Sequence, residues 1–274
     1  MHYLLIDGSY WVFFRYYALM RWMSLAHKDV DLKDPYKNKL FRDKFIATFI
    51  SKLDSIKETL DIDDLNIIVA KDCSRKDIWR NALYDKYKAT RDKDDSFMGG
   101  PFFGLAYDHI DISGNPTEGL FKIAGVSKFV EHPHLEADDC IALIVNKYIK
   151  NTNHTCTIIT GDLDYLQLNY DNVNLMTLKM KPLATEKNSV GDPKKDLMLK
   201  IILGDKSDNI ESVFKRCGKK TALKMIEDTS IFIKKISDDE CMKRFKLNQT
   251  LIDFTEIPKN LCEEFYCSLT IDFD

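Results

Sequence analysis

Short apolar runs alternate along this chain with longer stretches that carry helical periodicity. The runs are rich in Leu, Ile, Val and Thr, which is typical of buried strands; they cover residues 3–6, 65–70, 155–160 and 173–178. Apolar side chains recur every three or four positions from Leu40 to Leu60, and residues 10–22, 140–149 and 197–203 also suit helices. This alternation predicts an α/β fold with a mostly parallel sheet and crossover helices on its faces.

Two stretches interrupt this pattern. Residues 27–39 are polar and contain Asp34-Pro35, which predicts a loop. Residues 94–119 contain Gly99-Gly100-Pro101 and Gly114-Asn115-Pro116, a composition that resists a long continuous helix. We therefore expect irregular structure in both places.

Acidic residues gather where the predicted strands end or a predicted helix begins. Asp7 and Asp72 follow the first two strands, Asp162 and Asp164 follow the third, and three acids open the helix that runs to Ile149: Glu136, Asp138 and Asp139. Because the carboxyl ends of parallel strands share one edge of the sheet, we expect these acids to line one crevice. Each group also has a simpler interpretation, since acids stabilise a helix dipole and serve in turns. Gathered together they would repel one another unless cations joined them.

The segment after residue 203 combines acids with bases. Asp205 and Asp208 stand three positions apart, so on one helical turn they would face the same way. Residues 213–224 then hold five bases and no acid, and the pattern predicts a tight turn leading into a helix. Backbone amides and lysines at such a junction suit a phosphate of a nucleic-acid strand. The alternative is an ordinary basic helix start, which would be unfavourable to its own dipole.

A second basic stretch covers residues 71–93. Its eight lysines and arginines are interleaved with Trp79, Tyr84 and Tyr87. Basic side chains can bind phosphates, and aromatic rings beside them can stack on nucleobases. A solvated helix face with salt bridges to the acids of the same stretch is the alternative.

Composition bounds the class of protein. The chain has 274 residues, of which 45% are apolar, so it can bury one large α/β core or two small ones. Its seven cysteines are scattered without a Cys-x-x-Cys pair, which fits reduced thiols and an intracellular protein. No apolar run approaches the roughly 20 residues of a membrane span, and we expect no signal peptide. The formal net charge of −3 says little, whereas the segregation of acids and bases points to separate sites.

Six motifs together carry a family resemblance. In chain order they are Ile6-Asp7-Gly8-Ser9, Ala70-Lys71-Asp72, Tyr87-Lys88-Ala89-Thr90-Arg91, Glu136-Ala137-Asp138-Asp139, Thr160-Gly161-Asp162-Leu163-Asp164 and Gly204-Asp205-Lys206-Ser207-Asp208-Asn209. In this order they resemble the structure-specific 5′-nucleases, the superfamily of flap endonucleases and 5′–3′ exonucleases. Trp79-Arg80 and the segment from Leu251 to Pro258 add a likeness to the bacteriophage RNase H type.

The resemblance implies a fold, a domain division and a set of metal ligands. The fold would be PIN-like, with a catalytic domain at residues 1–190, an arch region at about 86–130, and a helical duplex-binding domain at 191–274 that contains a helix–two-turn–helix. Two Mg²⁺ ions, for which Mn²⁺ may substitute, would bind between carboxylates. The first ion would be lined by Asp7, Asp72, Glu136 and Asp138, and the second by Asp139, Asp162, Asp164, Asp205 and Asp208.

The resemblance also implies roles for other residues. Lys88 and Arg91 would stabilise the scissile phosphate, with Asp139 and Asp162 as the acids on which catalysis depends most. Contacts to nucleic acid would come from Arg75, Arg80, Tyr87, Lys215, Arg216, Gly218, Lys219 and Lys220. A K⁺ ion is implied near the helix–two-turn–helix, although only Gly218 stands where the family has two glycines, and Gly99-Gly100-Pro101 departs from an arch helix.

The expected function is a Mg²⁺-dependent 5′-nuclease that removes RNA primers or 5′ flaps in DNA replication and repair. Its substrates would be branched or nicked duplex DNA, 5′ flaps and RNA–DNA hybrids. We expect a monomer that works with replication proteins such as a single-strand-binding protein or a sliding clamp, and a viral origin is compatible with the likeness. The alternatives are a catalytically silent nucleic-acid-binding module of the same fold and a PIN-type endoribonuclease. Acids facing a polyanion argue against the first alternative, and residues 204–224 against the second.

Overall fold

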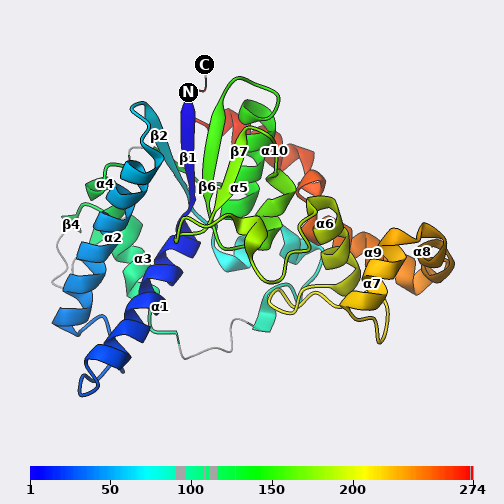
Figure 1. The fold of residues 1–274 in the computed structure, drawn as a ribbon, viewed down its shortest axis with the longest axis horizontal. Coiled ribbons are helices and arrows are strands. Elements are labelled where there is room, and N and C mark those ends of the chain that lie inside the picture. Colours follow the sequence, from blue (N-terminus) through cyan, green and yellow to red (C-terminus); the bar gives the residue numbers. More distant parts are fainter. Residues whose placement is uncertain (91–96, 108, 111–115, 127, 272, 274) are drawn as a thin grey trace.

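A five-stranded parallel sheet forms the centre of the computed structural model, which describes all residues except 91–96, 108, 111–115, 127, 272 and 274. The strands lie in the order β5-β2-β1-β6-β7, and every pair is parallel. Their bounds are β1 His2–Asp7, β2 Leu65–Ala70, β5 Lys128–Val130, β6 Thr155–Ile159 and β7 Val173–Met176. The structure thus confirms the predicted parallel α/β sheet (Figure 1).

Helices cover both faces of this sheet. Four of them lie on one face, namely α1 Gly8–Ala26, α2 Lys39–Leu60, α3 Gly100–Tyr107 and α4 Leu120–Ile123. The other face carries α5 Ala137–Ile144, which continues as a π-helical turn to Ile149, and α10 Lys259–Ser268. Side chains alternate along a strand, so Leu4 and Ile6 pack in the first layer while Tyr3 and Leu5 pack in the second.

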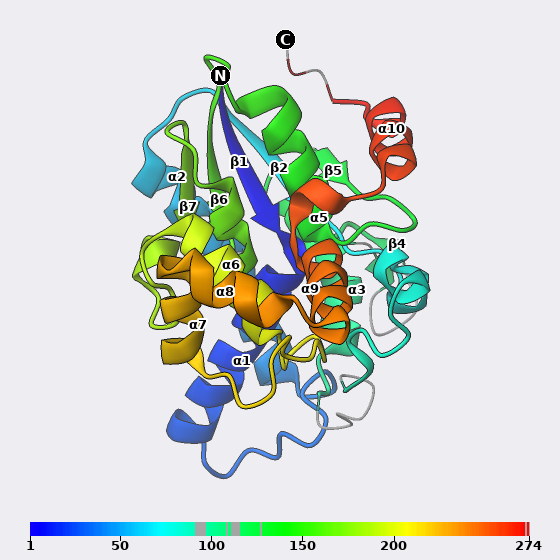
Figure 2. The same ribbon diagram turned by 90° about the vertical axis from the view of Figure 1, so that its right-hand side faces the viewer.

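A group of helices extends beyond one end of the sheet (Figure 1). It consists of α6 Pro193–Leu203, α7 Lys219–Glu227, α8 Thr229–Ile236 and α9 Asp239–Ile252. These helices share their own apolar cluster, which includes Leu199, Phe214 and Met225. Figure 2 shows α8 and α9 on the side of the molecule that faces the viewer, and Lys200 of α6 pairs with Asp164, five residues past the end of β6, so α6 lies near the carboxyl end of that strand. The domain division at residue 190 stays a prediction. The chain after α9 returns to the sheet, since Phe254 and α10 pack into its core.

The pattern of hydrophobic and polar positions did not predict the short elements. β5 has three residues, and the antiparallel pair β3 His109–Ile110 and β4 Pro116–Thr117 has two in each strand, which is too few for a period to show. Helix α3 begins at Gly100 and has eight residues. Pro101 is tolerated there because the first turn of a helix leaves its N–H groups unpaired. Within the described residues, no helix is both long and apolar enough to cross a membrane.

Candidate active site

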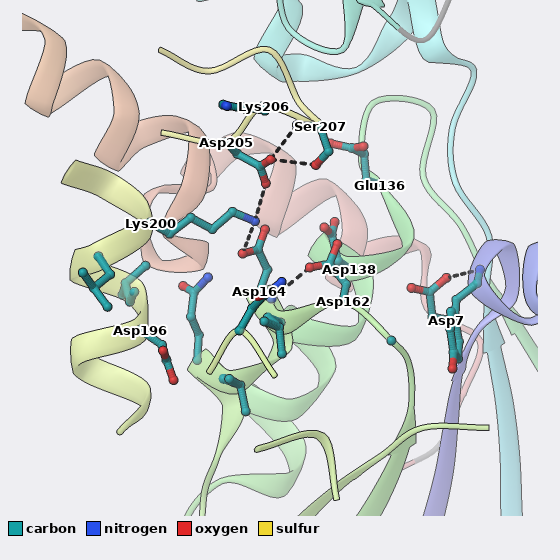
Figure 3. Close-up of a pocket in the computed structure, with 18 of the residues that line it drawn as sticks. Asp7, Glu136, Asp138, Asp162, Asp164, Asp196, Lys200, Asp205, Lys206 and Ser207 are labelled. Carbon is teal, nitrogen blue, oxygen red and sulfur yellow. Dashed lines mark hydrogen bonds and ion pairs between the residues drawn. The ribbon is translucent and has the colours of Figure 1, made fainter. Parts of the chain in front are cut away.

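Seven of the nine predicted acidic ligands line one cleft of about 820 Å³. They are Asp7, Asp72, Glu136, Asp138, Asp162, Asp164 and Asp205. Lys88, Lys200 and Lys219 line the same cleft. Figure 3 shows carboxylates of Asp138, Asp162 and Asp164 gathered between the strand ends and α6. The parallel sheet produces this gathering because β1, β2 and β6 all end at this edge.

The first acid is held by the junction of β1 and α1. The Asp7 carboxylate caps α1 by accepting a hydrogen bond from the Tyr10 N–H at 2.9 Å, and it also accepts one from the Thr160 hydroxyl at 3.3 Å. Gly8 follows because there is no room for a larger residue. A Cβ atom at Gly8 would lie 1.9 Å from the Tyr107 hydroxyl oxygen and 2.8 Å from the Ala70 carbonyl oxygen.

Asp72 links the end of β2 to the start of α5. Its Oδ1 accepts a hydrogen bond from the Ala137 N–H at 2.7 Å, and its Oδ2 accepts one from the Ser9 hydroxyl. The same helix start is closed by Glu136 and Asp139, whose side chains cap each other's backbone N–H groups. These bonds fix the acids of three elements relative to one another.

A buried arginine lies beneath the cleft. The Arg80 guanidinium is 2% exposed and forms a two-pronged ion pair with Asp139, with N–O distances of 2.7 and 2.8 Å. It also donates to Glu136 at 3.0 Å and to the Leu251 carbonyl at 2.8 Å. The Trp79 indole N–H donates to the same Asp139 carboxylate at 2.9 Å. The predicted contact of Arg80 to nucleic acid would require these bonds to break, because the guanidinium is enclosed and donates to two carboxylates and a carbonyl.

This network also determines where Asp139 stands. The Asp139 carboxylate is fully buried, and it is not among the residues that line the cleft. One ligand atom each from Glu136, Asp138 and Asp139 nevertheless lie within 4.8 Å of one another. Asp208 is 8% exposed, and its carboxylate approaches the Lys88 ammonium at 3.9 Å instead of lining the cleft. The role of both acids as metal ligands stays a prediction.

Tyr87 and Lys88 both reach Glu136. The Tyr87 hydroxyl donates to Glu136 at 2.9 Å, and the Lys88 ammonium forms an ion pair with the same carboxylate. Tyr87 is only 6% exposed, so its predicted contact to nucleic acid would require this buried side chain to move. Lys88 has a φ of 55°, an uncommon backbone conformation outside glycine. The predicted partner Arg91 lies outside the described residues.

Lys200 is a residue of the cleft that the sequence analysis did not single out. This residue projects from α6 into the cleft, where its ammonium pairs with Asp164 and, at 2.7 Å, with Asp205 (Figure 3). Its position five residues before Asp205 is the only signal, and a lysine on a helix is more often a solvated residue. Lys200 neutralises part of the acidic cluster from the side of α6.

The remaining predicted contacts to nucleic acid are exposed. Lys215 and Arg216 stand on the turn that leads into α7, Gly218 is the N-terminal cap of that helix, and Lys219 and Lys220 are its first two residues. The Lys219 ammonium donates to the Asn188 carbonyl at 3.0 Å and lies at the rim of the cleft. Arg75 is exposed at the start of a short 3₁₀ helix. The structure therefore places the basic turn beside the acids.

Several acids of the cleft resist ionisation. Burial, and next the charge of Asp72, raise the pKa of Asp7 to about 7. Burial also raises the pKa of Asp164 to about 7, in spite of the neighbouring Lys200. Burial and the charge of Asp139 raise the pKa of Asp138 well above its usual value. A divalent cation would favour their ionised forms, and clustered carboxylate oxygens are the hard donors that Mg²⁺ prefers, so the residues present fit such an ion.

These pKa values predict how pH acts on the protein in chelator. An unfolded Asp has a pKa of about 3.9, so between about pH 4 and 7 the folded chain holds protons on Asp7 and Asp164 that the unfolded chain has lost. Their contribution to stability therefore decreases as pH rises through this window. We expect the melting temperature of Asp7→Asn, measured in chelator from pH 5 to 8, to fall less steeply than that of the unsubstituted protein. Parallel curves would contradict this assignment.

Residues 2–195 match the family model described as the 5′-3′ exonuclease, N-terminal resolvase-like domain. The chain belongs to this family. A 5′-3′ exonuclease of Bacillus subtilis is 26% identical over 280 residues, which cover 98% of this chain and 84% of the relative. Ribonuclease H of Enterobacteria phage T4 is 26% identical over 225 residues, which cover 76% of this chain and 70% of the relative.

A much longer protein and a solved structure also resemble this chain. DNA polymerase I of Streptococcus pneumoniae is 28% identical over 265 residues; the match covers 92% of this chain but only 27% of the polymerase. The chain thus spans about a quarter of that relative. A solved structure of the bacteriophage T5 flap endonuclease with DNA and metal ions superimposes with a TM-score of 0.63 at 17% identity, covering 97% of this chain and 96% of the other. This chain therefore shares the fold of that T5 protein.

Proposed function

We propose that this chain is a metal-dependent, structure-specific 5′-nuclease that hydrolyses phosphodiester bonds in DNA replication and repair. The observation that carries the proposal is the gathering of Asp7, Asp72, Asp138, Asp162, Asp164 and Asp205 around one cleft, beside an exposed basic turn. A site for a polyanion needs cations among its acids, since carboxylates alone would repel the phosphates.

Two groups of acids would hold two divalent ions. Asp7, Asp72 and Asp138 would hold one with Glu136 nearby, and Asp162, Asp164 and Asp205 would hold the other; Mg²⁺ fits this donor set and Mn²⁺ can replace it. Such a pair, when bound, stabilises the attacking and the leaving oxygens of phosphodiester hydrolysis. The chain's part is to orient the acids, through the Asp72 bonds and the buried Arg80. Lys200 would have to share Asp164 and Asp205 with a cation.

Lys88 is the proposed contact to the scissile phosphate. It lines the cleft, carries a positive charge and stands three residues before Arg91. A donor that acts mainly in the transition state is worth about 2.7–4 kcal/mol. Lys88→Ala should therefore lower single-turnover cleavage roughly 100- to 1,000-fold, while the dissociation constant for substrate, measured with Ca²⁺ in place of Mg²⁺, changes little.

The exposed Lys86, two positions earlier, provides the matched control, and Lys86→Ala should cleave at a near-normal rate. Melting curves of both variants check that the fold is intact, because Lys88 also pairs with Glu136. A near-normal rate for Lys88→Ala, or a loss confined to binding, would remove Lys88 from the catalytic residues.

Substrate classes and partners belong to the same proposal. Lys215, Arg216, Lys219 and Lys220 would position duplex through phosphates without reading sequence. The substrates would be 5′ flaps, nicked duplex and RNA–DNA hybrids, with residues 1–190 as the catalytic domain and residues 191–274 as the duplex-binding domain. An intracellular setting, a K⁺ ion near Gly218 and contacts with replication proteins are further parts of the proposal. The similarity to an exonuclease, an RNase H and a flap endonuclease supports it.

A direct test compares two substrates side by side with Mg²⁺. One is a 5′-labelled flap and the other an RNA-primed duplex, and product lengths are measured on both. We expect short 5′ products that mark cleavage at or near the junction. Intact substrates would favour a silent binding module, and cleavage inside single-stranded RNA alone would favour an endoribonuclease.

A further inference from the structure

Three basic residues lie along the edge between α1 and α2, together with a tryptophan and a threonine and without an acidic residue among them. We call this group the basic ledge and define it as Arg15 and Trp22 of α1 with Lys44, Thr48 and Lys52 of α2. The two helices lie side by side (Figure 1), and the Lys44 ammonium stands 4.7 Å from the centre of the Trp22 ring. Helix α1 contains no acidic residue at all.

The acids of α2 do not neutralise the ledge. Lys44, Thr48 and Lys52 follow one another at four-residue spacing and so share one face of the helix. Asp43 pairs with Lys39 at 2.5 Å and Asp54 approaches Lys57 at 3.6 Å, away from that face. The third acid, Glu58, is six residues after Lys52 and so lies about 240° around the helix from it. The ledge therefore keeps its positive charge.

Arg15 has no partner among the described residues. Its Nε atom is fully covered by protein, yet neither this atom nor the rest of the guanidinium forms a hydrogen bond or ion pair there. Burial alone lowers the pKa of Arg15, and no acid opposes that effect. A covered donor without an acceptor is unfavourable unless a ligand supplies the acceptor.

Lys52 adds a second unpaired cation beside Arg15. Burial and then the Arg15 charge lower the pKa of Lys52, so the two cations are close enough to repel each other. No ion pair of Lys52 occurs within the described part of the chain. Two neighbouring cations without an acid form a site for an anion.

The length of the ledge favours a polyanion over a small ion. Lys44 and Lys52 are eight residues apart, which is about 12 Å along a helix. A nucleic-acid strand carries one phosphate per roughly 3.4 Å of duplex axis, so several phosphates fit this span. The Trp22 ring is 40% exposed and lies under a cation, an arrangement that also suits stacking on a base.

The ledge is separate from the cleft. Phe13 of α1 lines the cleft, whereas Arg15, two residues later, lies about 200° around the helix. A strand on the ledge would therefore not be the one that enters the cleft.

We propose that the basic ledge binds the phosphate backbone of a second segment of the nucleic-acid substrate, on the face of α1 turned away from the cleft. This proposal rests on the proposed function for its choice of ligand. Arg15 and Lys52 contact phosphates, and Lys44 with Trp22 extends the contact along α2.

The test measures binding as a function of salt, with a fluorescent flap duplex in Ca²⁺ and the substrate checked afterwards for integrity. The double variant Arg15→Gln/Lys52→Gln should weaken binding at least tenfold at low salt. It should also lower the slope of log affinity against log salt by about 1.4 to 1.8 units, the value for two lost phosphate contacts. The variant Arg15→Lys/Lys52→Arg keeps both charges and should keep the slope.

The matched control is Lys37→Gln/Lys39→Gln, which removes two charges from side chains that are 79% and 81% exposed and paired with acids. Its slope should equal that of the unsubstituted protein. The proposal would be overturned if the slope of log affinity against log salt decreased equally in the two Gln double variants, or if it decreased in neither. Stabilisation by inorganic phosphate that needs Arg15 and Lys52 while the slope stays unchanged would also overturn it, since the site would then hold a small anion. Because the comparison needs binding alone, lack of cleavage would count against the proposed function and not against the ledge.

Discussion

Replacing Asp162 with Asn should reduce the single-turnover rate of 5′-flap cleavage by at least about 1,000-fold. A metal pair lowers the activation free energy by several kcal/mol, and each 1.36 kcal/mol of activation free energy changes the rate about tenfold. Asp162 stands at the end of β6 in the cleft, where its side chain also caps the following 3₁₀ helix through the Asp164 N–H at 3.0 Å. Asparagine can keep that cap while it removes one unit of negative charge. The loss should therefore appear in cleavage and not in folding.

Affinity for the substrate should change in the opposite sense or very little. Removing a carboxylate weakens the hold on a cation but also reduces repulsion of the phosphate backbone, so the dissociation constant should stay within a few fold. Asp171→Asn, at an exposed position outside the cleft, is the matched control and should cleave normally. Near-normal cleavage by Asp162→Asn would show that this acid holds no catalytic ion.

Arg80→Met should lower the free energy of unfolding by about 3–5 kcal/mol, the usual effect of breaking a buried ion pair from one side. Methionine occupies part of the volume but leaves the buried carboxylates of Asp139 and Glu136 without their guanidinium. Chemical denaturation with urea measures this loss. The double variant Arg80→Met/Asp139→Asn should recover part of the loss because it removes one unpaired charge.

The control for Arg80 is an arginine of similar chemistry in an exposed pair. Arg244 lies against Glu211 with side chains that are 34% and 58% exposed, and Arg244→Met should cost less than about 1 kcal/mol. A small effect of Arg80→Met, comparable to that of Arg244→Met, would contradict a structural role for Arg80. It would also reopen the contact to nucleic acid that the sequence predicted.

The position of most acids could be predicted from the sequence because the rule is local. Asp7, Asp72 and Asp162 each follow an apolar run that makes a strand, and parallel strands bring their ends to one edge. The local sequence around such a residue therefore predicts that it lies at this edge of the sheet.

The partners of those acids could not be predicted in this way. Arg80 and Tyr87 lie in a basic, aromatic stretch that has the composition of a surface, yet both are buried against Glu136. Lys200 comes from a helix that is adjacent to Asp164 only because α6 crosses the end of the sheet. Such pairs join residues from 36 to 59 positions apart, so only the tertiary fold brings them together.

The central claim is that the acidic cleft cleaves 5′ ends with the help of divalent cations. The most direct measurement is single-turnover cleavage of a 5′-labelled flap by the unsubstituted protein, first in excess chelator and then as Mg²⁺ is titrated in. We predict no product in chelator and a rate that rises with Mg²⁺ to saturation, with Asp162→Asn inactive throughout. Full-rate cleavage in chelator, or no cleavage at any Mg²⁺ concentration, would contradict the claim.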